Sequence, residues 1–247
     1  FIGRTESADL IHWTPPTIVL GPDAHDPTDS DIYTSAAFKH DEGESAYFML
    51  PSFFDWRRGH LWIQLATSRD GVNWCRAGNR EAFIPLGAPH SFEAESVYAG
   101  IPPLRKDDQL HFYYCGTDQP HWGGMGRGQA HTTGIAVATL RLDGFISIDA
   151  GEKPSGGTVT TVPLRFRGTH LEINADAHWG EIKVELLDES GKAIEGFARA
   201  DCDPVISDSV RHRLEWAGGD LSRLAGTTVK LRFYLCCARL YAFQFST

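Results

Sequence analysis

The 247-residue chain lacks several features that would each define a class of protein. No apolar run approaches the roughly 20 residues needed to cross a bilayer, and no signal segment opens the chain, so we expect a soluble protein whose compartment stays open between cytoplasmic and secreted. Basic residues are few, with 23 Lys+Arg against 32 Asp+Glu, and the longest cluster is Arg57-Arg58. Nucleic-acid binding would need a basic stripe. A neutral or polar partner is therefore expected, with no nucleic acid and no membrane.

The cysteines lack a defining pattern too. There are five, an odd number, without a C-x-x-C pair or a repeated Cys/His spacing: Cys75, Cys115, Cys202, Cys236 and Cys237. A zinc site or a disulfide framework is therefore disfavoured. Free cysteine packs as a small hydrophobe, so we expect these side chains to be buried for packing.

Helical periodicity is also missing, and the periodicity that is present belongs to strands. Residues 61–68 (LWIQLATS) alternate between two faces. Residues 32–38, 111–116 and 133–142 are short runs rich in β-branched and aromatic residues, bounded by Gly, Pro, Asp or Asn. These patterns predict an all-β chain.

A short motif occurs twice. Residues 7–13 (SADLIHW) and 68–74 (SRDGVNW) share the frame Ser-x-Asp-x-x-x-Trp, and residues 141–145 (RLDGF) resemble a degenerate third copy. The order of strands and polar turns after the first copy recurs after the second. A repeated unit of four strands is typical of β-propeller blades, whose small sheets bury their faces against neighbouring blades.

The motif itself is interpreted as a structural turn. Asp and Gly would form a tight hairpin between outer strands, the carboxylate would accept backbone N–H groups, and the Trp would pack between adjacent blades. The alternative is a direct functional role for Asp9, Asp70, Trp13 or Trp74.

The amino-acid composition changes after Gly151, where a segment rich in Gly, Pro, Lys and Ser separates the repeats from a second region. Alternation in EIKVELL and VKLRFYL predicts an antiparallel sheet with one buried face, and a β-sandwich suits this length. We therefore predict a partial propeller at 1–154, of about two to two and a half blades, and a C-terminal β-sandwich at 155–247. The sandwich has no recognisable chemical motif, which leaves a structural role or ancillary sugar binding.

The paired turns, the acidic segments DSDIY and FEAESVYAG, the segment HFYYCGTDQPHW, the LRLDGF exit and the terminal LYAFQF together resemble the five-bladed β-propeller glycoside hydrolases of families 43 and 32. The resemblance implies a funnel-shaped site on the propeller axis with carboxylates at the start of the innermost strands. In family 43-like enzymes an Asp is the general base, a second Asp tunes the acid, and a Glu protonates the leaving group; in family 32-like enzymes the first Asp is a nucleophile. One carboxyl must be protonated while its neighbour is charged.

Few positions match this pattern. Asp31 opens one inner strand and Glu93 or Glu95 opens the next, so these three are the candidate catalytic residues. Asp31 shares its loop with three other aspartates, so a solvated loop face and a cation ligand are its alternatives. Which glutamate is the acid is left open.

Polar and aromatic residues also occur in two equivalent loops, which should emerge on one face of a propeller. They are the candidate sugar-binding residues, because aromatic rings stack on sugars and His or Arg bind hydroxyls: Trp56, Arg58, His60, Asp118, His121 and Trp122. Ordinary loop packing is the alternative. No cofactor is required; some relatives carry a calcium ion on the axis, for which His111 and His121 are the only candidates here.

The chain departs from the family in one respect, because the N-terminal blade that carries the first catalytic carboxylate is missing. Either the chain is a truncated fragment, or copies associate through exposed strand edges as a homo-oligomer, most simply a dimer completing the ring. The expected function is a glycosidase acting on a xylosyl, arabinosyl or fructosyl unit. A non-catalytic carbohydrate-binding protein and an inactive structural fragment are the alternatives.

Overall fold

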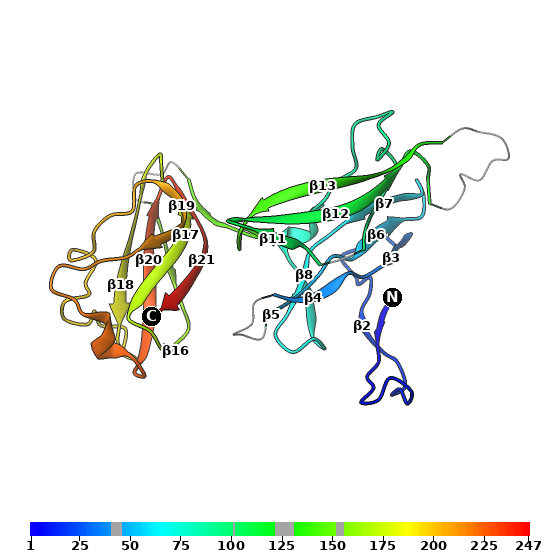
Figure 1. The fold of residues 1–247 in the computed structure, drawn as a ribbon. Helices are drawn as coiled ribbons and strands as arrows, with labels where there is room; N and C mark the ends of the chain where they lie inside the picture. Colours follow the sequence, from blue (N-terminus) through cyan, green and yellow to red (C-terminus); the bar gives the residue numbers. More distant parts are fainter. Residues whose placement is uncertain (41–45, 101, 122–130, 152–155) are drawn as a thin grey trace. The chain divides into compact units, whose positions relative to one another are not determined.

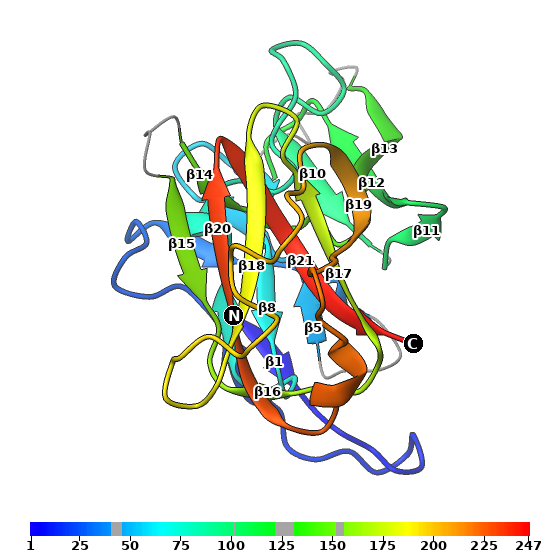
Figure 2. The same cartoon turned by 90° about the vertical axis from the view of Figure 1, so that its left-hand side faces the viewer.

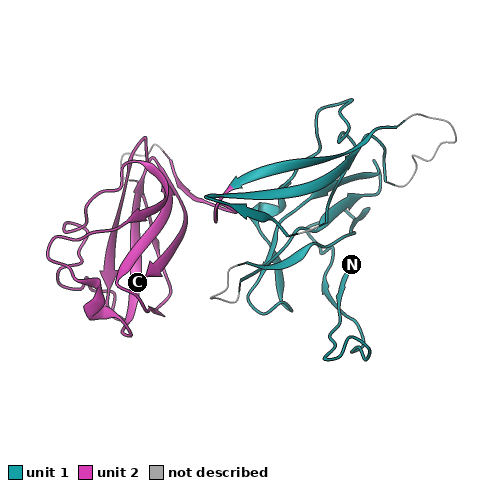
Figure 3. Ribbon diagram, in the orientation of Figure 1, with its two compact units in different colours: residues 1–140 teal, residues 141–247 magenta. Residues whose placement is uncertain are grey.

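The computed structural model describes residues 1–40, 46–100, 102–121, 131–151 and 156–247. Within these ranges the regular elements are strands, apart from two short 3-10 helices, η1 (Gly78–Arg80) and η2 (Leu221–Leu224). The prediction of an all-β chain is confirmed. The chain divides into two compact units, Phe1–Leu140 and Arg141–Thr247 (Figure 3), and each is described by itself.

Unit 1 begins with an antiparallel hairpin of β1 (Ile2–Arg4) and β2 (Thr17–Leu20), and the first copy of the motif lies in its connection. Four antiparallel runs follow. The first contains β3 (Ser30–Ile32) and β4 (Ala37–His40), the second β5 (Ala46–Met49) and β6 (Ser52–Asp55), the third β7 (His60–Ile63) and β8 (Ala66–Ser68), and the fourth β9 (Trp74–Arg76). One sheet has the order β4-β5-β8-β9, while β3, β6 and β7 belong to another.

Main-chain hydrogen bonds continue across the breaks in these runs. Tyr33 N donates to Ser52 O at 2.9 Å, and Ser52 N donates to Thr34 O at 3.1 Å. The strands predicted at 32–38 and 61–68 are nevertheless each divided into two: the first into β3 and β4, and the second into β7 and β8. Pro51 lies at the break in the second run and has no N–H to donate, which interrupts the ladder there.

The remaining strands of unit 1 extend the sheet that contains β7. They are β10 (Ser96–Ala99), β11 (Leu104–Lys106), β12 (Gln109–Thr117) and β13 (Thr133–Arg141). β12 pairs with β10, β11 and β13, and Figure 1 shows β12 beside β13. β10 pairs with β7 in parallel at Ser96 and Leu61. The runs predicted at 111–116 and 133–142 are confirmed as strands.

A buried cluster joins the first hairpin to the four antiparallel runs. It comprises Ile2, Leu20, Ile32, Met49, Phe53 and Ala66. Trp74 packs against this cluster. Trp13 does not, because its side chain is 53% exposed; Trp74 is the first residue of β9, whereas Trp13 lies four residues before β2 begins.

Unit 2 consists of two antiparallel sheets around one hydrophobic core (Figure 2). The first has the order β14 (Ile148–Ala150), β21 (Ala238–Ser246), β17 (His170–Asp176), β19 (Asp208–Arg213). In the second, β20 (Thr228–Cys236) pairs with β15 (Gly157–Thr160), β16 (Leu164–Arg165) and β18 (Glu181–Leu187). The division of the chain falls at 140/141 rather than 154/155, because β14 hydrogen-bonds to β21.

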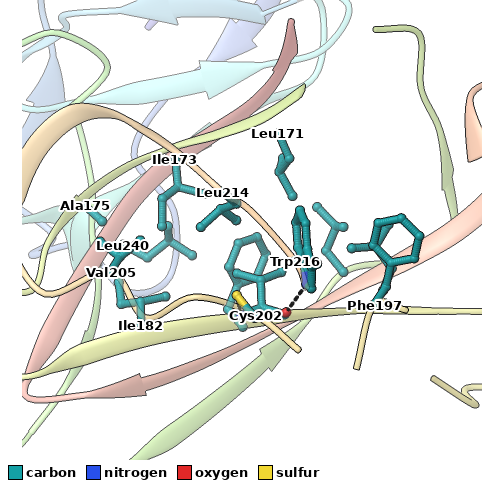
Figure 4. Close-up of a cluster of buried hydrophobic side chains, with 14 of the residues drawn as sticks. Leu171, Ile173, Ala175, Ile182, Phe197, Cys202, Val205, Leu214, Trp216 and Leu240 are labelled. Atoms are coloured by element: carbon teal, nitrogen blue, oxygen red, sulfur yellow. Dashed lines mark hydrogen bonds between the residues drawn. The ribbon is translucent and has the colours of Figure 1, made fainter. Parts of the chain in front are cut away.

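Side chains from both sheets fill this core (Figure 4). Leu171, Ile173, Ile182 and Val184 are fully buried. The Trp216 indole lies among them and donates its N–H to Val184 O at 2.9 Å, which satisfies a buried donor. The core of unit 2 is thus apolar, and its buried indole N–H is hydrogen-bonded. Among the described residues, it contains no cluster of titratable side chains.

All five cysteines are free thiols. Cys202 is buried in the core of unit 2, as expected, but Cys75 is exposed and the other three are half-buried. The expectation of general burial is therefore wrong for Cys75, which lies on β9 with its side chain directed away from the core. The described part of the chain has no helix with the length and apolar character of a membrane span.

Candidate functional site

The two copies of the repeated motif form the same turn. Asp9 Oδ1 accepts the N–H groups of Ile11 and His12 at 2.9 and 2.8 Å, and Asp70 Oδ1 accepts those of Val72 and Asn73 at 2.8 and 2.7 Å. The indoles of Trp13 and Trp74 donate to the carbonyls of Leu10 and Gly71. Backbone N–H groups lower the pKa of both aspartates, and these carboxylates are used by the turn itself. The structural interpretation of the motif fits this geometry.

Two equivalent loops of unit 1 come together, as their repeat positions predict. One is the turn between β6 and β7, and the other follows β12. His121 N, in the second loop, donates to Gly59 O, in the first, at 2.7 Å. Gly59 has φ +74°, a conformation that glycine adopts at little cost. We call this surface the rim. It is formed by the β6–β7 turn, by Asp118 and His121 in the loop after β12, and by the starts of β3 and β10.

His121 is enclosed by aromatic rings. Its Nδ1 lies 2.9 Å from the Tyr98 hydroxyl, and its ring contacts Tyr33 at 4.2 Å and Phe54 at 5.0 Å between centroids. Burial lowers the pKa of His121, which favours the neutral imidazole. The sequence analysis did not include Tyr33, Tyr98 or Phe54, although Tyr33 and Tyr98 each follow the start of an inner strand in the repeat.

Two of the rim aromatics present a large part of their surface to solvent. Trp56 is 51% exposed and Tyr33 is 49% exposed. Both rings pack on Phe54, with centroid separations of 4.6 and 6.3 Å. They form a supported aromatic surface of the kind that stacks on the apolar face of a sugar.

Glu95 lies within hydrogen-bonding distance of His60 at the rim. Its Oε2 lies 2.7 Å from His60 Nε2, and the two side chains are 31% and 27% exposed. Its main chain is held on both sides, because Leu61 N donates to Glu95 O at 3.1 Å and Glu95 N donates to Thr117 O at 3.2 Å. The predicted residues His60 and Glu95 are thus brought together, and both remain accessible.

Glu93 has a different partner. The Tyr114 hydroxyl on β12 donates to Glu93 Oε2 at 2.6 Å. Burial, together with the hydrogen bond to and the charge of Glu93, raises the pKa of Tyr114 to about 12. In the described part of the chain, no hydrogen bond or ion pair joins Glu93 to Glu95.

Asp31 lies in β3, opposite Phe54 in the strand register. Its Oδ1 accepts the N–H of Ile32 at 2.7 Å and lies 2.9 Å from the amino group of Phe1. Among the described residues, no interaction links it to either glutamate.

The remaining predicted rim residues serve the loops or project from them. Arg58 is exposed, and its N–H reaches Asp55 Oδ1 at 3.4 Å. Asp118 Oδ1 accepts Thr132 N at 2.9 Å, which closes the loop after β12. Trp122 lies outside the described residues.

A calcium ion does not fit the described rim. Calcium takes six to eight oxygen ligands, and no group of three or more His, Cys, Asp or Glu residues that could hold a metal occurs in the ranges that the structure describes. His121 faces aromatic rings, and the Nε2 atom of His111 is buried without a hydrogen-bond partner. No step of the proposed chemistry is therefore assigned to a metal.

Two cavities lie away from the rim. One has a volume of about 490 Å³ and is lined by the β1–β2 hairpin, by β4 and β5, and by the second copy of the motif. The other has a volume of about 450 Å³ and lies beside β5 and β8. Neither contains a predicted catalytic or sugar-binding residue.

No protein-family model and no curated protein matches the chain. A search of solved structures finds an N-acetylgalactosamine deacetylase from F. plautii, whose crystal structure contains blood group B trisaccharide, with a TM-score of 0.42 and 18% identity. The match covers 57% of this chain and 41% of that one. A likeness of this size does not bear on the function of this chain.

Proposed function

We propose that the rim binds a small sugar unit, xylosyl, arabinosyl or fructosyl in type, and that the protein hydrolyses its glycosidic bond. The observation that carries this proposal is the Glu95–His60 pair, at 2.7 Å, beside the exposed aromatic surface of Trp56 and Tyr33. An accessible carboxyl next to an imidazole can exchange a proton with a leaving group, and the aromatic rings supply the stacking surface.

In this proposal Glu95 is the general acid and Asp31 the supporting carboxylate. Glycosidases need one carboxyl group that donates a proton and a second that activates water or attacks carbon. Asp31 comes from β3, which β6 and β7 separate from β10 in the sheet, on the same edge of unit 1 as the β6–β7 turn. Glu95 is preferred to Glu93 because its partner, His60, is itself exposed on the rim.

The finer fold belongs to the same proposal. We infer that the four antiparallel runs from β3 to β9 are one propeller blade, that β10 to β13 belong to a second, and that unit 2 is a β-sandwich. Support comes from the order β4-β5-β8-β9, from the hydrogen bonds that continue into β3, β6 and β7, and from the identical turns. The family 43 and 32 glycoside hydrolases are the class that this arrangement resembles.

Hydrolysis of a panel of aryl xylosides, arabinosides and fructosides tests the activity. We expect slow release of the aryl group by the wild-type protein and a loss of at least roughly 100-fold in Glu95→Gln, since the acid is removed without changing its size. Glu81→Gln, which alters an exposed glutamate away from the rim, is the control and should keep full activity. No release at high enzyme concentration would rule out hydrolysis.

Non-catalytic carbohydrate binding is the second candidate. It is favoured by the absence, among the described residues, of a link between Asp31 and either glutamate, while the aromatic surface is in place. Isothermal titration with xylo-, arabino- and fructo-oligosaccharides separates the two. Binding that is lost in Trp56→Ala and retained in Glu95→Gln, without turnover, would identify a binding protein.

A further inference from the structure

The side chain of Glu93 lies against two glycines, Gly87 and Gly116, and a side chain on either neighbour would collide with it. A Cβ atom at Gly116 would lie 2.5 Å from Glu93 Cβ, and one at Gly87 would lie 2.4 Å from Glu93 Cγ. Both distances are shorter than any normal contact between carbon atoms. The side chain of Glu93 is therefore packed directly against the main chain on two sides, with little freedom to reach a substrate.

The main chain around Glu93 is fixed as well. Gly87 N donates to Glu93 O at 3.0 Å, and Ala94 N donates to Ser91 O at 3.2 Å. Phe92 packs over Gly134, where an added Cβ would lie 2.9 Å from the ring. The turn formed by residues 91–95 is thus held by its neighbours before Glu95 is reached.

Tyr114 supplies the remaining restraint. Its hydroxyl is 2.6 Å from Glu93 Oε2, and a hydrogen bond to a charged group is among the stronger ones in proteins. Three residues further along β12, Thr117 O accepts Glu95 N. One strand therefore restrains Glu93 through a side chain and Glu95 through the main chain.

We propose that Glu93 and Tyr114 are positioning residues, which hold the turn of residues 91–95 so that Glu95 faces His60. This inference rests on the proposed role of Glu95 as the acid. Neither residue contacts the substrate. They fix the main-chain carbonyl and N–H groups of the turn. The turn in turn directs the Glu95 side chain toward the rim.

The kinetic test compares Tyr114→Phe and Glu93→Gln with Glu95→Gln. Tyr114→Phe removes one hydrogen bond to a charged group, so kcat should fall roughly 10- to 100-fold with KM nearly unchanged. Glu93→Gln keeps an oxygen that accepts from Tyr114 and should retain activity within about three-fold of wild type, with an unchanged pH profile. Tyr113→Phe, at the adjacent exposed tyrosine, is the matched control.

Two outcomes would overturn the inference while leaving hydrolysis intact. One is a loss of turnover in Glu93→Gln as large as in Glu95→Gln, which would make Glu93 catalytic. The other is wild-type kcat in Tyr114→Phe.

A measurement independent of activity separates this inference from the proposed function. In an NMR spectrum at constant pH, the imidazole resonances of His60 should move in Tyr114→Phe, because Glu95 would no longer be held at 2.7 Å, and should stay in place in Tyr113→Phe. An unmoved His60 in Tyr114→Phe would overturn the inference whether or not the protein hydrolyses sugars.

Gly116→Ala provides a second route to the same displacement. Its backbone does not need positive φ, so alanine strains the site through contact with Glu93 and with the Phe92 ring, both in the turn of residues 91–95. The His60 resonances should move in this variant too.

Discussion

The two repeated turns differ at one residue whose backbone conformation matters. Leu10 has φ +62°, and Gly71, at the same position of the second copy, has φ +71°. A side chain in the left-handed region costs about 1–2 kcal/mol, because Cβ approaches the following carbonyl oxygen. Glycine avoids this contact. The first copy therefore carries strain that the second copy does not.

Leu10→Gly should stabilise unit 1. Leu10 is 77% exposed, so little burial is lost, and relief of the strain outweighs the added entropy of the unfolded chain by about 0.5 kcal/mol. Gly71→Ala should lower the free energy of unfolding by about 1 kcal/mol for the opposite reason. Urea unfolding measures both. Ile11→Gly, at the neighbouring exposed residue without positive φ, should give no gain; an equal gain there would contradict the explanation.

Local chemistry explains which site features could be predicted from the sequence. The Asp9 and Asp70 turns could be, because donor and acceptor lie within three residues of each other. The partners of the glutamates could not, because Tyr114 and His60 come from other strands. His121 was a candidate by its loop position alone, and its aromatic enclosure depends on how three strands meet.

At the scale of elements, the loop between β2 and β3 is held by ion pairs. Asp26 and Asp23 both pair with Arg76 and Arg80, and the side chains of Arg76 and Asp26 are only 2% and 4% exposed. Asp29, further along the loop, pairs with Arg57 at 2.6 Å. These pairs fasten the start of β3, and with it Asp31, to the β6–β7 turn and to β9.

Asp26→Asn should destabilise unit 1 by about 2 kcal/mol. Removing one partner of a buried pair leaves Arg76 without its nearest counter-charge, and the cost is moderated because Asp23 remains 3.6 Å away. Asp29→Asn, whose carboxylate is 46% exposed, should cost less than about 1 kcal/mol and serves as the control. Urea unfolding at pH 7 measures both. Equal costs would contradict a special role for the buried pair.

The stabilisation from Asp26 should also depend on pH. Burial alone would raise the pKa of Asp26, but the hydrogen bond and charge of Arg76 outweigh it and lower the pKa. The pKa in the folded state then lies below that in the unfolded state, which is near 4. The contribution is complete above about pH 4 and is lost as the pH falls through the folded value. The difference in stability between wild type and Asp26→Asn should therefore shrink as the pH falls below about 4, and a constant difference would disprove this linkage.

The strand patterns in the sequence predicted where strands lie better than they predicted whether each strand is continuous. Residues 111–116 and 133–142 alternate without interruption and became β12 and β13. The runs at 32–38 and 61–68 are each divided, because the central run beside them contains Pro51, which cannot donate to the ladder. The pairing of β10 with β7 is parallel and joins distant segments, so no local pattern could specify it.

At the scale of the whole molecule, β13 is an open edge. It pairs with β12 on one side, and no strand in the described ranges pairs with its other side. Its exposed residues alternate with less exposed ones and are two threonines and two apolar residues: Ile135 is 80% exposed and Val137 is 47% exposed, and Tyr113 on β12 is 40% exposed. An exposed edge strand of nine residues with two apolar side chains favours association with another strand. We propose a second copy of this chain as the partner.

The dimer is tested by light scattering of the purified chain. We expect a mass near twice 27.3 kDa, falling to the monomer mass when lysines are placed on the edge in Ile135→Lys/Val137→Lys, because like charges facing each other across a two-fold interface repel. Val162→Lys/Ile206→Lys alters two residues of unit 2 that are 79% and 63% exposed, and should leave the mass of the assembly unchanged. A monomer mass for the wild-type chain would exclude completion of the ring by a second copy. A dimer that survives the edge substitutions would place the interface on another face of the chain.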